Sequence, residues 1–550
     1  MKIVIIGAVA GGTSAAAKAR RNDEEAEIII FDKDKDISYS GCGLPYYIGN
    51  KVNDRGELVP RDANFFKKKY NVDVFTQHEV LSIDASGKKL TVKNLNTEEV
   101  FVEEFDKLVI STGASSVIPN IPGVDKNNVF YLRNVQSADR IKNFINENNP
   151  KKVVIVGSGF IGLEMTENLK ELGIDVTVVE LAPQVMPPLD KDMATYIERY
   201  LIKKAVNLIL GDSVASIEGE VENTKLILSS GKIIEADFVI MAVGIKPNAM
   251  IAKKAGIELG ESGAIKVNIK MQTNYDYIYA CGDCAESYSL ITGQDIYRPL
   301  GSTANKTGRI VGDSITGGDL EFRGILGTGI FKVFDLAVAY TGLSEKEAIK
   351  EGYEVVVCHN IKPDKAIYYG GEELTIKAVA DKNTSKLLGV QIVGTNGVDK
   401  RIDVFATAIT FGAKVEDLFH LDLAYAPPFS TTKDPVMYTG MILDNAINKG
   451  RELITPEELK ARIKKGEKIK IIDARVSGQY AAGHVEESKN IPQDKIRGIL
   501  DGLDKDEITV TYCNKGVTGN AVQNILINNK FKKVYNLSGG FKNYKNGSPK

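Results

Sequence analysis

The sequence of 550 residues predicts an α/β protein with two Rossmann-like dinucleotide-binding domains, an α+β domain and a small C-terminal α/β domain. Three observations carry this prediction. A pattern of strand, glycine loop and helix near the start is repeated 150 residues later. The stretch 324–448 mixes strands and helices without a glycine fingerprint, and an α/β alternation restarts at 455, after a polar linker.

The repeated pattern predicts two βαβ units. Residues 2–7 and 152–157 are apolar, β-branched runs that end at a glycine, as expected for strands buried in a parallel sheet. A helical stretch and a second apolar strand follow each run, and the second strands end at Asp32 and Glu180. This order of elements is typical of a dinucleotide site, in which the acid accepts a ribose hydroxyl.

The second glycine loop is a complete G-x-G-x-x-G formed by Gly157, Gly159 and Gly162, and Glu180 lies 23 residues after Gly157. The first glycine makes the turn, the second admits the pyrophosphate, and the third lets helix and strand pack closely. The carboxylate of Glu180 should repel a 2′-phosphate. The sequence therefore predicts NADH as the electron donor, with NADPH as the alternative.

The first glycine loop carries Val9 where the middle glycine would stand, but Asp32 still follows Gly7 by 25 residues. A later segment, 273–283, ends in Gly282-Asp283 and is typical of a flavin nucleotide site. Two further strands, 105–113 and 236–244, end at glycines where the backbone should pass close to a nucleotide. The expected cofactor-binding residues are Gly7, Ala8, Gly11, Gly12, Asp32, Thr112, Gly113, Gly157, Gly159, Gly162, Glu180, Gly244, Gly282 and Asp283.

Composition excludes several classes of protein. Seventy basic and 72 acidic residues leave a formal net charge of −2, so no overall basic field exists to hold nucleic acid. No apolar run is long enough to cross a membrane. Five cysteines spread thinly suit a reducing cytoplasm, and none of the four histidines pairs with another at metal-ligand spacing, so no metal site is expected.

Cys42 is the candidate redox thiol. It lies ten residues after Asp32, in a segment whose glycines allow the backbone to approach a flat ring. A helix that starts here would lower the thiol pKa and favour the thiolate. The alternative is a small cysteine in the core. Cys281 and Cys284 flank the flavin motif, and both are expected to be structural, as is Cys358 in an apolar strand.

Residues 1 to about 448 resemble the FAD-dependent pyridine nucleotide-disulfide reductases, specifically the coenzyme A-disulfide reductase branch. The resemblance rests on the first glycine loop, the single cysteine of Ser38-x-x-x-Cys42-Gly-Leu-Pro-Tyr, Gly282-Asp283 and the segment 424–430. Some relatives have a second cysteine five residues after the first, and this chain has Tyr47 at that position. Those relatives also have a late His-Pro pair, where this chain has His420-Leu421. The histidine of the oxidase and peroxidase branch is replaced by Ala10.

The resemblance implies that Cys42 alternates between a thiolate and a mixed disulfide with coenzyme A. It also implies a homodimer in which a third-domain tyrosine of the partner subunit acts near the flavin, which matches Tyr425, with Tyr368 as the second candidate. Ser14, Lys18, Arg21, Ser38 and Lys433 match positions that contact coenzyme A in relatives.

Residues 455–550 resemble a rhodanese domain. The resemblance is carried by the segments 471–475, 480–485, 490–492 and 537–541. Cys513 ends an apolar strand and precedes a loop that enters a helix, an arrangement that stabilises a thiolate or persulfide. Thr518 replaces the usual loop arginine, which argues against activity on thiosulfate, although Lys515 is a partial substitute.

Together these features predict a flavoprotein oxidoreductase that passes electrons from NAD(P)H through FAD to Cys42 and reduces coenzyme A disulfide, coenzyme A persulfide or polysulfide, while Cys513 handles sulfane sulfur. The alternatives are an NADH oxidase or peroxidase, and a slow sulfur carrier or redox sensor. The expected domains are FAD-binding (1–112 plus 244–323), NAD(P)H-binding (113–243), dimerisation (324–448) and rhodanese (455–550).

Overall fold

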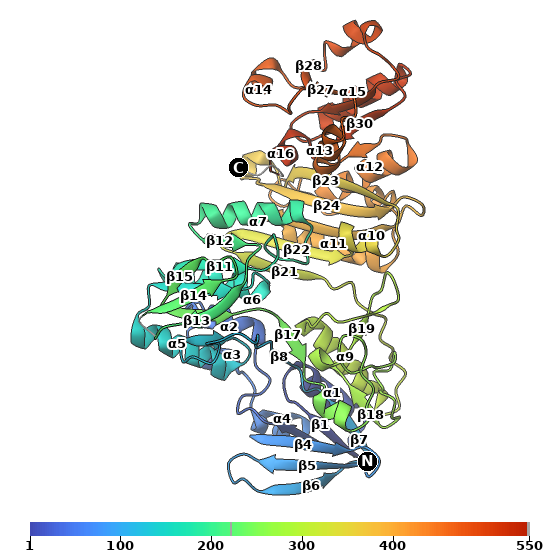
Figure 1. The fold of residues 1–550 in the computed structure, drawn as a ribbon. Helices are drawn as coiled ribbons and strands as arrows, with labels where there is room; N and C mark the ends of the chain where they lie inside the picture. Colours follow the sequence, from blue (N-terminus) through green and yellow to red (C-terminus); the bar gives the residue numbers. More distant parts are fainter. Residues whose placement is uncertain (221–222, 547–550) are drawn as a thin grey trace. The chain divides into compact units, whose positions relative to one another are not determined.

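The computed structural model describes residues 1–220 and 223–546 (Figure 1). The last four residues of the C-terminal domain expected at 455–550 therefore lie outside the described residues. The chain forms two compact units, one of residues 1–183 and 206–327 and the other of residues 184–205 and 328–550. Residues 184–205, in the middle of the region expected to bind NAD(P)H, thus belong to the second unit.

The first unit contains the two predicted parallel sheets. One has the order β18-β7-β1-β2-β3, with β1 at its centre. The other has the order β12-β11-β10-β16-β9, with β10 at its centre. Their inner strands are almost fully buried, which explains the apolar, β-branched runs that identify them. The strands are β1 (Lys2–Ile6), β2 (Glu27–Asp32), β3 (Asp73–Thr76), β7 (Lys107–Ile110), β18 (Ile278–Ala280), β9 (Val129–Tyr131), β10 (Lys152–Val156), β11 (Asp175–Glu180), β12 (Asn207–Leu210) and β16 (Phe238–Met241).

Helices follow the glycine loops directly. α1 (Ala10–Asn22) and α6 (Phe160–Glu171) begin inside the loops, so each starts three or four residues earlier than the helical stretches at 14–21 and 163–172 in the sequence. α1 packs closely on α9 (Gly301–Ser314): a Cβ at Gly308 would lie 2.3 Å from the carbonyl oxygen of Gly11. Other helices of this unit are α2 (Leu44–Ile48), α3 (Arg55–Leu58), α4 (Ala63–Tyr70), α5 (Val135–Asn148) and α8 (Met250–Lys254).

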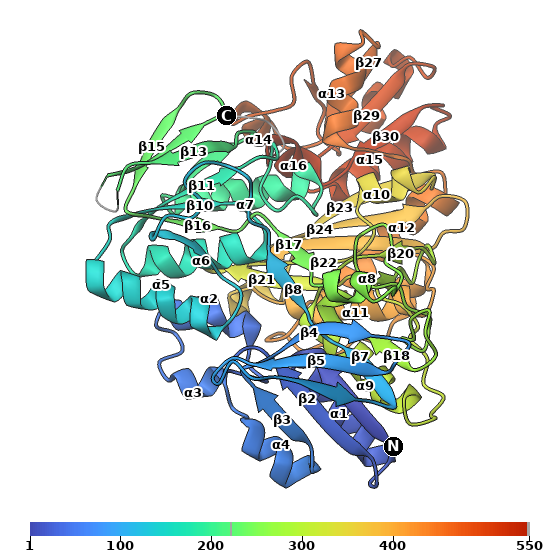
Figure 2. The ribbon, with the colours of Figure 1, turned by 60° about the horizontal axis from the view of Figure 1, so that its bottom comes forward.

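Small antiparallel sheets complete the first unit. The β4-β5-β6 sheet lies next to β2 (Figure 2), and β13-β14-β15 follows β12 along the chain. Their strands are β4 (His78–Asp84), β5 (Lys89–Asn94), β6 (Val100–Glu104), β13 (Val214–Glu218), β14 (Thr224–Leu228) and β15 (Ile233–Ala236), with the pairs β8 (Ala114–Ser116) and β17 (Ile245–Pro247), and β19 (Ser287–Tyr288) and β20 (Asp295–Ile296).

The second unit begins with an antiparallel sheet of order β21-β22-β25-β24-β23, which confirms the predicted α+β domain. The central strand β25 and its neighbour β24 are buried along almost their whole length, because helices cover the sheet. α7 (Lys191–Lys203) lies against it (Figure 1). The remaining elements are β21 (Gly329–Val333), β22 (Leu336–Gly342), β23 (Val355–Pro363), β24 (Glu373–Asp381), β25 (Leu387–Gly394), α10 (Glu345–Lys350), α11 (Val398–Thr410) and α12 (Pro435–Asn448).

The C-terminal part of the second unit is a parallel five-stranded sheet of order β26-β30-β29-β27-β28, as the α/β prediction requires. Its middle strand, β29, ends immediately before Cys513. The elements are β26 (Leu453–Ile454), β27 (Ile469–Asp473), β28 (Lys489–Asn490), β29 (Ile508–Tyr512), β30 (Val534–Leu537), α13 (Pro456–Lys464), α14 (Ser477–Ala481), α15 (Val517–Asn528) and α16 (Gly540–Asn546). Within residues 1–220 and 223–546, every helix lacks the length and hydropathy of a bilayer-spanning segment.

Candidate active sites

The first glycine loop forms a tight cradle at the carboxyl end of β1. Gly7 has a φ of 104°, and a Cβ at this position would lie 2.2 Å from the carbonyl oxygen of Ser111. A Cβ at Gly12 would lie 1.9 Å from the carbonyl oxygen of Gly7, so both positions require glycine. The Asp32 carboxylate accepts a hydrogen bond of 2.6 Å from the backbone N–H of Ala8, and burial raises the pKa of Asp32 to about 6.

The second glycine loop repeats this geometry. Gly157 has a φ of 101°, and a Cβ at Gly162 would lie 2.1 Å from the carbonyl oxygen of Gly157. A Cβ at Gly159 would meet nothing within 4 Å, so this position borders the open space that a pyrophosphate needs. The Glu180 carboxylate accepts hydrogen bonds from the backbone N–H and hydroxyl of Ser158, at 2.8 and 2.7 Å.

The predicted flavin motif at 282–283 follows β18 on the same sheet as the first loop. Gly282 has a φ of 75°, and its N–H donates to the hydroxyl of Thr307 at 3.2 Å. Asp283 forms an ion pair with Arg133 at 3.1 Å. Arg133 belongs to no motif in the sequence, so only the structure identifies it as part of this site. Gly11 also lies close to Gly282, since a Cβ at Gly11 would be 3.5 Å from the Gly282 nitrogen.

Three more expected cofactor residues lie where backbone segments join the two sheets. Gly113 and Gly244 have φ values of 66° and 108°, so both adopt the left-handed conformation that favours glycine. The Thr112 hydroxyl donates to the carbonyl oxygen of Asn248 at 2.7 Å. The two buried acids, Asp32 and Glu180, fit the ribose hydroxyls of FAD and of a nicotinamide nucleotide. The backbone of the glycine loops fits the phosphate groups.

Cys42 is exposed, in a 3₁₀ turn (Gly41–Gly43) immediately before α2. The expected lowering of its pKa is wrong for the protein alone: partial burial, with Glu164 and Asp283 nearby, raises the pKa of the Cys42 thiol. The short helix α2 has only five residues, so its dipole does not outweigh these effects. Burial, with the neighbouring Glu167, also raises the pKa of Glu164 to about 7.

Glu164 was not identified as a candidate from the sequence, although it lies only two residues after the last glycine of the second loop. The position of a second redox cysteine is held by Tyr47, whose hydroxyl donates to the carboxylate of Asp139 at 3.0 Å. The three cysteines expected to be structural, Cys281, Cys284 and Cys358, are buried. Burial raises the pKa of the Cys358 thiol to about 12.

The expected coenzyme A contacts of the first unit gather on and near α1. Ser14, Lys18 and Arg21 are spaced by one turn, so their side chains share one side of the helix. The Ser14 hydroxyl donates to Asn305 at 2.8 Å, and Lys18 forms an ion pair with Asp313 at 2.9 Å. Ser38 adopts a left-handed conformation with a φ of 48°, and its N–H donates to the carbonyl oxygen of Ala8 at 2.8 Å.

The tyrosines expected to act from a partner subunit lie at the surface of the second unit. Tyr368 is 77% exposed and Tyr425 is 49% exposed. Lys433 lies just before α12, and its ammonium is 6.0 Å from the ring centroid of Tyr438. All three side chains are therefore accessible to another molecule.

Cys513 lines a cavity of about 470 Å³ at the carboxyl ends of the C-terminal sheet. Its carbonyl oxygen accepts a hydrogen bond from the N–H of Phe541 at 2.8 Å. Gly516 has a φ of 95° and caps α15, so the loop turns directly into the helix. Thr518 and Lys515 also line the cavity, and the ammonium of Lys515 forms an ion pair with Glu373.

Three family models match the chain. The pyridine nucleotide-disulphide oxidoreductase model covers residues 1–297, and the dimerisation domain of the same group covers 329–435. A rhodanese-like domain matches residues 455–547.

Two relatives match about four fifths of the chain. A protein of Methanocaldococcus jannaschii named NADH oxidase is 37% identical over 438 residues, which is 79% of this chain and 97% of the relative. A protein of Pyrococcus furiosus named NAD(P)H sulfur oxidoreductase (CoA-dependent) is 38% identical over 444 residues, 80% of this chain and 99% of the relative. The crystal structure of reduced CoADR-RHD of Bacillus anthracis matches almost the whole chain, with 40% identity, a TM-score of 0.96, and coverage of 99% of this chain and 98% of that one.

Proposed function

Because the chain belongs to the pyridine nucleotide-disulphide oxidoreductase family, we propose that it is an FAD-dependent NAD(P)H reductase of coenzyme A disulfide, coenzyme A persulfide or polysulfide. The observation that carries the proposal is one exposed thiol, Cys42, beside the nucleotide cradles, joined in one chain to a second thiol, Cys513, in a cavity of its own. The likeness to CoADR-RHD over nearly the whole chain supports it.

Each nucleotide has its own set of residues in this proposal. Gly7, Gly12 and Asp32, with Asp283, hold FAD, and residues 1–112 plus 244–323 form its domain. Gly157, Gly159 and Glu180 hold NADH within residues 113–243. The loop N–H groups bind phosphate oxygens, and the two acids accept ribose hydroxyls. FAD, when bound, supplies the two electrons of NADH to the disulfide at Cys42.

The chemistry at Cys42 is thiol–disulfide exchange. The Cys42 thiolate attacks the coenzyme A sulfur of a persulfide, CoA–S–SH, the S–S bond breaks, and hydrosulfide leaves. With coenzyme A disulfide, the leaving group is a coenzyme A thiolate. Two electrons and a proton then convert the mixed disulfide into the Cys42 thiolate and free coenzyme A. Ser14, Lys18, Arg21 and Ser38 orient the carrier in this scheme.

A homodimer completes the site. Residues 324–448 form the dimerisation domain, and the exposed Tyr425 and Tyr368 of one subunit reach the flavin site of the other, with Lys433 contacting the phosphates of coenzyme A. A tyrosine hydroxyl there donates a proton to the leaving thiolate. The chemistry requires both thiols to remain reduced, so we place the protein in the cytoplasm.

Cys513 handles sulfane sulfur in the rhodanese domain, residues 455–550. Its thiolate attacks the outer sulfur of a donor persulfide, R–S–SH, the S–S bond breaks, and R–S⁻ leaves Cys513–S–SH behind. This reaction exchanges one persulfide for another and needs no electrons. The sulfur then passes to a carrier that Cys42 can reduce.

An NADH oxidase is the second candidate, because a relative with that name is 37% identical over most of the chain. Ala10 argues against an oxidase, because the oxidase and peroxidase branch has a histidine at this position. The two functions differ in what accepts electrons from Cys42.

An acceptor screen tests the proposal. NADH consumption is followed without oxygen on addition of coenzyme A disulfide, coenzyme A persulfide or polysulfide, and separately with oxygen alone, for the wild type and Cys42→Ser. We expect turnover with the sulfur acceptors that depends on Cys42. Oxygen turnover that exceeds all three sulfur acceptors would establish the oxidase instead.

A further inference from the structure

Three charged side chains are among the described residues that line the cavity of Cys513, namely Arg475, Lys515 and Asp494. The Arg475 guanidinium is buried and forms an ion pair with Asp473 at 2.6 Å, so its charge is matched by a carboxylate inside the domain. The carboxylate of Asp494 repels an anion that enters the cavity. Lys515 is therefore the lining residue whose charge decides how strongly the cavity attracts anionic sulfur donors.

Lys515 is paired with an acid outside the rhodanese domain. Its ammonium forms an ion pair with Glu373, the first residue of β24 in the dimerisation domain. The Lys542 ammonium of α16 pairs with the same carboxylate. The Glu373 side chain is 29% exposed, so solvent screens its charge less than that of a fully exposed acid. The positive charge in the cavity wall is thus offset by a carboxylate that the preceding domain supplies.

The Cys513 loop and the start of α16 are packed together through their backbones. The N–H of Lys542 donates to the carbonyl oxygen of Asn514 at 3.0 Å. A Cβ at Gly540 would lie 2.3 Å from the carbonyl oxygen of Cys513, so the two segments are in backbone contact. The two lysines that pair with Glu373 therefore come from neighbouring segments, and together they fix the position of its carboxylate relative to the loop.

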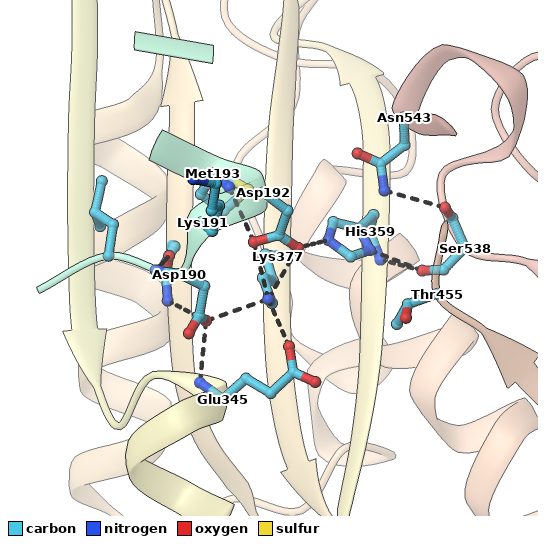
Figure 3. Close-up of polar contacts among 12 residues, drawn as sticks. Asp190, Lys191, Asp192, Met193, Glu345, His359, Lys377, Thr455, Ser538 and Asn543 are labelled. Atoms are coloured by element: carbon cyan, nitrogen blue, oxygen red, sulfur yellow. Dashed lines mark hydrogen bonds and ion pairs between the residues drawn. The ribbon is translucent and has the colours of Figure 1, made fainter. Parts of the chain in front are cut away.

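Buried polar contacts hold the dimerisation domain against these segments. The Ser538 hydroxyl accepts the backbone N–H of His359 at 2.7 Å and lies 3.0 Å from its Nδ1 (Figure 3). His359 Nε2 lies 2.6 Å from the Asp192 carboxylate, which also accepts from Lys377 at 2.9 and 3.0 Å (Figure 3). His359 is on β23, which pairs with β24, the strand that begins at Glu373. The start of β24 is therefore fixed beside the rhodanese domain.

We infer that Glu373, a residue of the dimerisation domain, sets the charge that the Cys513 cavity presents to anions and thereby selects its sulfur donors. Because Glu373 holds the Lys515 ammonium, the cavity attracts doubly charged donors such as thiosulfate weakly and favours donors of lower charge. The inference rests on the proposed function of Cys513 in sulfur transfer. It adds that the donor selectivity of the rhodanese domain depends on its contact with the preceding domain.

Two small donors differ in charge but not in the bond that breaks. Thiosulfate is a dianion, and methanethiosulfonate is a monoanion in which a methyl group replaces one charged oxygen. With either donor, the Cys513 thiolate attacks the outer sulfur, the S–S bond breaks, and sulfite or methanesulfinate leaves with the bonding electron pair. Both reactions leave the same Cys513 persulfide, so the ratio of their rates reports the response of the cavity to donor charge.

The first measurement tests the charge of the cavity without any sulfur transfer. In the full chain with Cys42→Ser, alkylation of Cys513 by the anion iodoacetate and by its neutral analogue iodoacetamide is followed by peptide mass. Only the thiolate reacts with either reagent, so the ratio of the two rates cancels changes in its ionisation and in access to the loop. We expect Glu373→Gln to raise the iodoacetate-to-iodoacetamide ratio about threefold or more, because Lys515 is then free to attract the anion. Glu373→Asp, which keeps the charge, should stay near the wild-type ratio.

Glu354→Gln is the matched control, because Glu354 lies just before β23 and its carboxylate pairs with a lysine, Lys382. A rise of the alkylation ratio in Glu373→Gln no larger than in this control overturns the inference. Lys515→Met removes the cation itself and should lower the ratio. Should Glu373→Gln fail to fold, an unchanged ratio in Lys515→Met has the same meaning.

The second measurement is the single-turnover formation of the Cys513 persulfide from each donor, also read by peptide mass. Glu373→Gln should raise the rate with thiosulfate relative to methanethiosulfonate about threefold or more. Persulfide formation from both donors with an unchanged ratio overturns the selection of donors by Glu373. A shifted alkylation ratio, with no persulfide from either donor in any variant, refutes the proposed sulfur transfer and leaves intact the charge that Glu373 sets at the cavity.

Discussion

The carboxylate of Glu180 accepts two hydrogen bonds from Ser158, one from the backbone N–H at 2.8 Å and one from the hydroxyl at 2.7 Å. In the first βαβ unit, Asp32 accepts one from Ala8 at 2.6 Å. The second residue of each glycine loop thus holds the acid that ends the second strand. Both carboxylates are oriented before any nucleotide arrives, which lowers the entropy lost when a ribose binds.

Glu180→Ala should relax the choice of nicotinamide nucleotide. The carboxylate repels a 2′-phosphate, so its removal should lower the ratio of kcat/KM for NADH to that for NADPH at least about tenfold, or about 1.4 kcal/mol. Steady-state rates with both nucleotides measure this. Ser158→Ala, which keeps the charge, is the control and should change the ratio less. A wild type that already uses NADPH equally well would refute the assignment.

Cys42→Ser should retain FAD and its reduction by NADH but lose reduction of coenzyme A disulfide and persulfide. Tyr47 stands where relatives have a second cysteine, so no other thiol can replace Cys42. Stopped-flow absorbance of the flavin and steady-state NADH consumption separate the two steps. Residual turnover above about a tenth of the wild-type rate would contradict a single-thiol mechanism.

Cys513→Ser should leave reduction of coenzyme A disulfide largely unchanged, because that step needs only Cys42 and the nucleotides. Turnover with polysulfide or a bulky persulfide should slow, and added coenzyme A should restore part of the rate by carrying sulfur between the sites. The measurement is NADH consumption with each acceptor, with Cys42→Ser as the reciprocal control. Equal rates with all acceptors would show that Cys513 does not participate.

Binding of FAD should weaken as the pH falls below about 6. Burial raises the pKa of Asp32 to about 6, so the protein without FAD carries a protonated Asp32 below that value. A protonated carboxyl accepts a ribose hydroxyl less well than a carboxylate does. The Kd for FAD, measured by fluorescence from pH 5 to 8, should therefore rise toward acid. Asp32→Asn should bind more weakly at pH 8 and lose this dependence; an Asn variant with the same pH profile would disprove the link.

Asp192→Asn should destabilise the second unit by about 3 kcal/mol, because it leaves the buried Lys377 and His359 without their shared carboxylate. The neighbouring Lys377 and His359 lower the pKa of Asp192 despite its burial. Its stabilising contribution is therefore complete above the unfolded-state pKa and is lost as the pH falls through the lower folded-state value.

Urea unfolding at pH 7 and at pH 3 measures both effects. The control is Asp335→Asn, which removes the partner of Lys204 at the surface and should cost about 0.5 kcal/mol or less. A loss in Asp192→Asn no larger than in the control would show that the buried network contributes little.

The fold is predictable from sequence because its signals are local. A Cβ at Gly157 or Gly162 would clash with the backbone, and Gly159 borders open space. The neighbouring strand β10 is almost fully buried. The acids Asp32 and Glu180 follow at fixed distances. The position of α7 in the second unit has no such signal, because an amphipathic helix does not specify which sheet it covers.

The environment of the thiols could not be predicted in the same way. Partial burial, together with Glu164 and Asp283 from separate elements, reverses the expected direction of the Cys42 pKa. Arg475, about 40 residues before Cys513 in the chain, lines the same cavity as this thiol. Electrostatics depends on which side chains the fold brings together, and no spacing in the sequence records that.

The chain passes between its two units three times, after residues 183, 205 and 327. A gene divided at 327 would therefore produce a second fragment without α7. Lys377 would lose Asp190 and Asp192, two of the three acids that pair with it among the described residues. A gene divided in the linker at 448–452 would separate complete sheets. The rhodanese domain is therefore one continuous segment, which a single gene fusion can add or remove. The dimerisation domain is not continuous, because its helix α7 lies within the sequence of the nucleotide-binding region, so the two must be inherited together.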